Sequence, residues 1–301
     1  MQNIEQERHS WIKLAVICAW LFLYGAATII GSRTDTEINV NNSDMVGLLY
    51  AGQLIGVVFL FIVPAVVFAG VWTKKRIHYL GITTKSSFKT LVLGSLGILF
   101  ALPLINWIAN INGQMHLPEA LSGVEEWMKN SEAKAMELTE LFTKGSSVSS
   151  LILNLFVVAF MAALSEELFF RGMIQKVLIE CFKNKHIAVW TGAILFSAFH
   201  MQFFGFFPRM LMGAYLGYLF LWSGSLWPGI IAHFVNNGMA VFLIWLSNRG
   251  AISTDVDKIG TFENEIMYVI TSAVVVIISL ILVYKINKKK MTSDSQTQEM
   301  I

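Results

Sequence analysis

Residues 151–172 read LILNLFVVAFMAALSEELFFRG, an apolar run that leads directly into two glutamates and an arginine. Charges within a membrane cost at least about 2.5 kcal/mol each, so they usually face the interior of a helical bundle and are paired. Glu167 and Arg171 have the i, i+4 spacing, acid first, that favours an ion pair on a helix. Glu166 lies about 100° further round the helix. It therefore needs a partner from elsewhere in the bundle, unless the helix ends there and the cytoplasm wets it.

The composition places this stretch in a polytopic membrane protein. Of 301 residues, 55% are hydrophobic and 14% are charged, whereas soluble domains carry about 25% charged residues. The net charge of +2 and the lack of a basic-aromatic patch argue against a nucleic-acid partner. We expect an all-α bundle with about eight transmembrane helices, since a span needs about 20 mostly apolar residues. The candidates are 12–31, 46–72, 89–111, 150–170, 187–204, 209–223, 226–246 and 266–286.

Charged residues between these segments predict the orientation, because lysine and arginine gather on the cytoplasmic side. Four basic clusters fall on one side: Arg8/Lys13, Lys74/Lys75/Arg76/Lys85, Arg171/Lys176/Lys183/Lys185 and Lys285/Lys288/Lys289/Lys290. The opposite loops are acidic, with Arg209 as the exception. This pattern predicts a multi-pass protein of the inner (plasma) membrane with both termini in the cytoplasm. Cys18 and Cys181 lie far apart and are expected to be two buried thiols without a disulfide.

Three regions follow from this layout. Residues 1–149 hold three spans and an acidic amphipathic segment, 150–246 hold the polar membrane residues, and 247–301 hold the last span and a basic polar tail. Within 113–149 we expect two short helices on the membrane surface, the second capped by Ser131. A mobile acidic loop is the alternative.

Few polar side chains are available to meet Glu166. His200 ends the apolar part of the predicted span 187–204. The predicted span 226–246 carries HFVNN (233–237). His233 and Asn237 are i and i+4, hence on one face, and Asn236 is expected to point elsewhere. The remaining histidines (His9, His78, His116 and His186) lie at predicted helix ends or in loops.

Together these groups could hydrolyse an amide. A desolvated glutamate becomes a general base near neutral pH, a histidine can help to hold its water, and a second histidine with a carboxamide can stabilise an oxyanion. No metal is favoured, but Glu166, His200 and His233 could instead hold a divalent ion such as Zn²⁺. H-E-x-x-H, the usual zinc signature on a helix, is missing.

Three motifs resemble those of the Abi or CPBP family of intramembrane endopeptidases, which are related to CAAX prenyl proteases. They are EELFFR (166–171), FSAFH (196–200) and HFVNN (233–237), and the resemblance covers about 150–246. It implies that Glu166 activates water with His200, that His233 and Asn237 stabilise the oxyanion, and that Glu167 and Arg171 support the site. It also implies a membrane-associated peptide substrate, such as a prenylated tail or a bacteriocin leader, at the lipid bilayer.

One expectation conflicts with this arrangement. The predicted boundaries place Glu166 near the cytoplasmic end of its helix, His233 about 10 Å in and His200 roughly 20 Å in. Two other functions remain open: a non-proteolytic membrane scaffold or bacteriocin immunity protein, and a coupled transporter. The transporter is disfavoured because the hydrophobic segments show no paired inverted halves.

Overall fold

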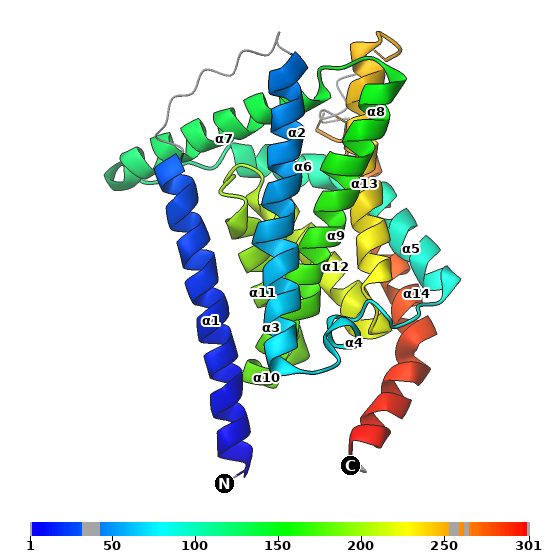
Figure 1. The fold of residues 1–301 in the computed structure, drawn as a ribbon. Helices are drawn as coiled ribbons and strands as arrows, with labels where there is room; N and C mark the ends of the chain where they lie inside the picture. The colour runs from blue at the N-terminus through cyan, green and yellow to red at the C-terminus, as the bar shows by residue number, and fades with distance from the viewer. Residues whose placement is uncertain (1, 32–42, 253–258, 262–264, 300–301) are drawn as a thin grey trace.

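The computed structural model describes residues 2–31, 43–252, 259–261 and 265–299, and all the regular structure in these ranges is helical (Figure 1). The all-α class is therefore confirmed. The first part of the chain comprises α1 (Gln2–Gly31), α2 (Ser43–Val57), η1 (Val58–Ile62), α3 (Val63–Trp72), α4 (Arg76–Leu80), α5 (Phe88–Leu99), α6 (Leu102–Gly113), η2 (Glu119–Leu121) and α7 (Ser122–Thr143). The second part comprises α8 (Val148–Asn154), η3 (Leu155–Met161), α9 (Ala162–Glu166), η4 (Glu167–Ile174), α10 (Gln175–Phe182), α11 (Lys185–Phe199), α12 (Phe206–Ser223), α13 (Trp227–Asn248) and α14 (Ile266–Glu299).

The central element is a single 35-residue helix, Val148–Phe182, built from α8 to α10 with π-helical stretches at η3 and η4. The predicted end at residue 170 is wrong. Glu167 and Arg171 are buried and paired with each other, so the helix does not have to reach water there. It continues to Lys183, whose left-handed backbone (φ 55°) ends it. Arg171 is thus an internal charge rather than part of a cytoplasmic basic cluster.

Helix α12 accepts hydrogen bonds from the central helix at two glycines and packs closely against α11. Arg171 Nη2 donates to the Gly213 carbonyl (2.9 Å), and Gln175 Nε2 donates to the Gly217 carbonyl (3.0 Å). A Cβ on Gly213 would lie 3.2 Å from the backbone of Ala193. Small residues at such contacts let helix backbones approach in a membrane, and here they also bring two carbonyls to buried donors.

The expected number of spans is not confirmed. Four described helices are long and apolar enough to cross a membrane: Gly47–Trp72, Val148–Phe182, Trp227–Asn248 and Ile266–Lys288. A fifth span results if α5 and α6 count together, although they meet at a 45° bend. The bend has a local cause, because Pro103 in the first turn of α6 cannot continue the hydrogen bonding of α5. Helix α11, with 15 residues, ends at Phe199 rather than at residue 204.

The acidic segment forms one helix, α7, which lies across one end of the bundle (Figure 1). The expectation of two helices is wrong: Ser131 is inside α7, and its hydroxyl donates to the Trp127 carbonyl one turn earlier. A serine bonded in this way stays within a helix instead of capping a new one. Met128 and Phe142 are buried beneath α7, whereas Trp127 remains partly exposed.

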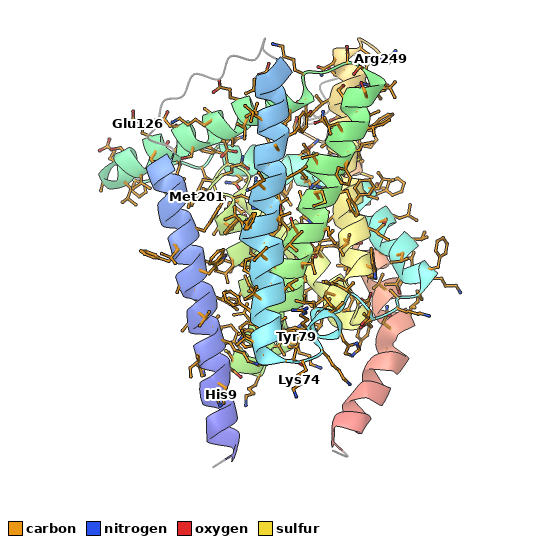
Figure 2. All side chains as sticks on the ribbon, viewed as in Figure 1. His9, Lys74, Tyr79, Glu126, Met201 and Arg249 are labelled. Carbon is orange, nitrogen blue, oxygen red and sulfur yellow. The ribbon has the colours of Figure 1, made fainter. Side chains whose placement is uncertain are left out.

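The two ends of the bundle carry different sets of ionisable residues. Figure 2 shows His9 and Lys74 at one end, and Glu126 of α7 together with Arg249 at the other. The start of α1 and the end of α14 lie at the His9 end, so both termini are on one side (Figure 1). Cys18 and Cys181 are free thiols, as predicted, although Cys18 is exposed and Cys181 half-buried.

Candidate active site

Three of the predicted site residues converge on one point from three helices. Glu166 Oε2, on the central helix, lies 4.0 Å from His200 Nε2 at the end of α11 and 3.8 Å from His233 Nε2 on α13. These distances are too long for direct hydrogen bonds. Glu166 Oε2 is buried and has no hydrogen-bond partner among the described residues. The carboxylate oxygen therefore faces two imidazole nitrogens at separations just beyond hydrogen-bond length.

His233 is fixed by the neighbouring glutamate. Its Nδ1 lies 3.0 Å from Glu167 Oε1, which also accepts a 2.7 Å bond from Arg171 Nη1. Because an ionised carboxylate can only accept, Nδ1 carries a proton and Nε2 is the nitrogen presented to Glu166. The side chain of Glu167 is 0% exposed and that of His233 is 2% exposed. This chain of bonds fixes both the ring orientation and the tautomer, as carboxylates do for functional histidines elsewhere.

His200 is held by the backbone instead. Its Nδ1 donates to the Phe196 carbonyl (2.9 Å), so its Nε2 also faces Glu166. The Phe196 ring makes edge contacts with both imidazoles, at centroid distances of 5.0 and 5.9 Å, and the Arg171 guanidinium lies 4.6 Å from its centre. One aromatic ring thus contacts both histidines and the buried cation. His200 is 28% exposed, which makes it the more accessible of the two rings.

A cavity of about 340 Å³ opens beside these three residues. Asn237 lines it, as predicted from its spacing to His233. Asn236 lines it as well, so the expectation that it points elsewhere is wrong: residues three apart are also neighbours on a helix surface. Asn236 Nδ2 donates to Asn237 Oδ1 (3.1 Å). This bond leaves the Asn237 NH₂ group without a partner among the described residues and next to the cavity.

The expected difference in depth between Glu166 and His200 is absent. Because the central helix continues to Phe182, Glu166 lies about 24 Å from that end, and His200 lies about 22 Å from the start of α11 at Lys185. The two residues are level near the middle of the bundle. The error arose from treating the charges at 166–171 as the end of a helix.

The comparisons with known proteins cover this part of the chain. Residues 148–239 match the family model of the Rce1-like type II CAAX prenyl endopeptidases. This segment is similar to that family. Over 100 residues the chain is also 28% identical to the uncharacterized protein YpbD of Bacillus subtilis (strain 168), a match that spans 32% of this chain and 46% of that relative. No solved structure matches. The family resemblance predicted from the three motifs is confirmed for this segment.

Sequence reasoning missed several residues around this site. Arg209 lines the cavity, and its role as the exception in the charge pattern was the available signal. The connection between α11 and α12, which we term the 200–205 loop, forms one wall and is held by residues outside the Rce1-like segment. Asn112 of α6 donates to the Phe203 carbonyl, and Glu132 of α7 accepts from the Phe204 amide. These long-range contacts carry no local sequence signal.

The donor set at the site is of a kind that can hold a metal. One carboxylate oxygen and two imidazole nitrogens are ligands that Zn²⁺ accepts at about 2.0–2.2 Å. In the part of the chain that the structure describes, no group of three or more His, Cys, Asp or Glu side chains has the arrangement of a metal site.

Proposed function

We propose that this protein is an intramembrane endopeptidase that hydrolyses a peptide bond with water activated by Glu166. The observation that carries the proposal is the placement of Glu166 Oε2 within 4.0 Å of two imidazole Nε2 atoms beside a cavity inside an apolar bundle. The match of residues 148–239 to the Rce1-like endopeptidases supports the same reaction class.

Glu166 acts as the base in this mechanism, and His200 helps to hold the water. Glu166 takes one proton from the water, whose oxygen adds to the carbonyl carbon of the substrate. The carbon–nitrogen bond then breaks, and the protonated Glu166 returns its proton to the leaving amine. No covalent enzyme intermediate is needed, and the carboxylate is regenerated. The Glu166 side chain is only 13% exposed, so both proton transfers take place away from bulk water.

The oxyanion of the tetrahedral intermediate is stabilised by His233 and Asn237. The Asn237 NH₂ group can donate directly, since it has no partner among the described residues. His233 donates from Nε2 when both ring nitrogens carry protons, because Nδ1 already bonds to Glu167. The buried Glu167 carboxylate compensates the positive ring, and Arg171 in turn fixes Glu167. Glu167 and Arg171 are thus positioning residues that do not touch the substrate.

The substrate is a membrane-associated peptide or protein, for which a prenylated tail or a bacteriocin leader are the candidates. The protein acts in the inner (plasma) membrane in contact with lipid, with both termini in the cytoplasm. The site lies near the middle of the bundle, so the scissile segment has to enter the membrane core rather than be cut at its surface.

The test compares Glu166→Gln with Glu180→Gln in purified full-length protein. Glu180 is on the same helix but pairs with Lys13 at 2.7 Å, away from the cavity. We expect Glu166→Gln to abolish cleavage of a pool of prenylated and unprenylated membrane peptides, read by mass spectrometry, and Glu180→Gln to retain it. Full cleavage by Glu166→Gln refutes the proposed base. Absence of cleavage by every variant favours the scaffold or immunity function.

A metal is tested in the same preparation. We expect activity to survive chelation and elemental analysis to find less than one equivalent of bound zinc. Activity that chelation removes and Zn²⁺ restores, together with zinc binding that the His233→Gln variant loses, would assign Glu166, His200 and His233 as ligands instead.

A further inference from the structure

Arg209 is a cation inside the cavity that the proposed reaction does not use. It is half-buried and lines the same cavity as Glu166 and His233. Its Nη1 donates to the Gln202 carbonyl (3.2 Å) and its Nη2 to Gln202 Oε1 (2.5 Å). Among the described residues no carboxylate forms an ion pair with it. A guanidinium has five donors in a planar fork, so these bonds leave part of the fork unused.

The carboxylates around Arg209 in the described part of the chain do not form an ion pair with it. Glu132 and Glu166 are the carboxylates whose charges act on Arg209, but neither contacts it. Glu132 accepts from the Phe204 amide (3.1 Å). Glu166 has to keep its oxygen free for the water that it activates. The cavity therefore offers an incoming anion a cation that has no direct counter-ion.

The guanidinium is also held in place before any ligand binds. It lies against Gly205, where a Cβ would be 3.0 Å from Nη2 and 3.6 Å from Nη1. Asn112 fixes the chain on both sides of this glycine, since its amide donates to the Phe203 carbonyl and accepts from the Phe207 amide. Fixing a donor in advance lowers the entropic cost of binding.

We propose that Arg209 determines specificity by binding a carboxylate of the peptide substrate. The inference rests on the proposed endopeptidase function and adds to it the residue that recognises a carboxylate near the scissile bond. Two sources have this chemistry, namely the α-carboxylate at the C-terminus of the substrate and an aspartate or glutamate side chain within it. A guanidinium binds either through paired, charge-assisted hydrogen bonds.

A purely structural role makes a different prediction. Arg209 could serve only to fasten the 200–205 loop through Gln202. In that case Gln202→Ala, which removes the side-chain acceptor and retains the guanidinium, should disturb the site about as much as Arg209→Met. If Arg209 binds substrate, Gln202→Ala keeps the preference for a carboxylate and Arg209→Met loses it.

Binding is measured first, in the Glu166→Gln background, so that the result does not depend on cleavage. The probes are three N-acetyl-Ala-Leu-Leu-based peptides: the free acid, the C-terminal amide, and the amide with its central leucine replaced by aspartate. We expect one of the two carboxylate peptides to bind roughly ten-fold to hundred-fold more tightly than the plain amide. Arg209→Met should remove the difference, and Arg209→Lys should retain part of it because lysine is charged but lacks the fork. Equal binding of all three peptides overturns the inference.

Cleavage then separates this inference from the proposed function. A degenerate peptide pool is supplied with free C-terminal acids or with C-terminal amides, and Glu166-dependent products are mapped by mass spectrometry. Cuts at a fixed distance from free C-termini only, lost in Arg209→Met, identify the terminal carboxylate as the ligand. Cuts in both pools next to aspartate or glutamate identify the side chain. Cuts in both pools without regard to acids leave the endopeptidase standing and refute the role of Arg209.

Discussion

Two ion pairs in this protein have the same spacing and the same length but lie in opposite surroundings. Glu125 and Lys129 on α7 are i and i+4 and meet at 2.7 Å, and so do Glu167 and Arg171 on the central helix. Lys129 is 54% exposed, whereas both members of the inner pair are at most 3% exposed. The outer pair competes with water for its charges. The inner pair has no water to replace a lost partner, so the consequences of breaking it are far larger.

The comparison also explains why adjacent glutamates have different tasks. Glu167 faces the dry interior, where Arg171 and His233 bind one of its oxygens. Glu166, about 100° further round, lines the cavity. Each glutamate has one oxygen without a hydrogen-bond partner among the described residues, but only Glu166 presents its carboxylate to the cavity. Glu167 thus supports the site through its bonds to Arg171 and His233, and Glu166 is available for chemistry because of where it lies.

The largest effect is expected from Arg171→Met. It removes the partner of Glu167 and leaves a carboxylate buried without compensation, which typically costs 3–5 kcal/mol. We expect a severe loss of folded protein in detergent, measured by thermal unfolding and by the monodisperse fraction in size-exclusion chromatography. Lys129→Met on the outer pair is the matched control and should behave as wild type. Equal behaviour of the two variants would contradict the comparison.

The second effect comes from the lack of space for an added methyl group beside the Glu167 carboxylate. A Cβ on Gly229 would lie 2.8 Å from Glu167 Oε2, whereas a Cβ on Gly238 of the same helix meets only ordinary contacts from 3.4 Å. Gly229→Ala should therefore destabilise the protein by about 1–3 kcal/mol through overpacking and lower the rate of cleavage by displacing His233. Gly238→Ala gains the same helix propensity and should be neutral or stabilising. The melting temperatures of the two variants decide the matter.

The third substitution, Glu166→Gln, should change the stability of the protein little although it abolishes activity. Glu166→Gln removes a carboxylate that has one oxygen without a hydrogen-bond partner among the described residues. We therefore expect the free energy of unfolding of this variant to lie within about 0.5 kcal/mol of the wild-type value or slightly above it. Glu167→Gln, one residue away, should be clearly destabilised because Arg171 loses its counter-ion. A destabilised Glu166→Gln would show that Glu166 serves the fold rather than the reaction.

The sequence predicted the parts of this arrangement that depend on local spacing. The i, i+4 relation of Glu167 to Arg171 led to the ion pair, and the three motifs led to Glu166, His200 and His233. The prediction of helix length was wrong at the charges of residues 166–171, which looked like a helix end in water. Because Glu167 and Arg171 pair with each other inside the bundle, the helix continues to Phe182. That error also produced the expected difference in depth.

The residues that the sequence did not reveal are those whose roles depend on distant partners. Glu132 contacts the amide of Phe204, 72 positions later, and Asn112 contacts Phe203 and Phe207. Nothing in the local sequence around Glu132 or Asn112 distinguishes them from ordinary polar residues. The break between α5 and α6 was visible in principle, since Pro103 marks it.

The smallest effect belongs to Glu125 on the outer pair, and it depends on pH. Hydrogen bonds from Lys129 and His116 and from the Leu117 amide lower the pKa of Glu125 from 4.5 to about 2. A carboxyl group with a lowered pKa stabilises the folded state fully above its unfolded pKa and loses that contribution as the pH falls towards the folded value. The difference in melting temperature between wild type and Glu125→Gln should therefore be slight and constant above pH 5, and should shrink between pH 4.5 and about 2. Because Lys129 is 54% exposed, salt should reduce this difference while leaving the effect of Arg171→Met unchanged. A difference that grows on acidification would mean that the Glu125 contacts do not stabilise its charged form.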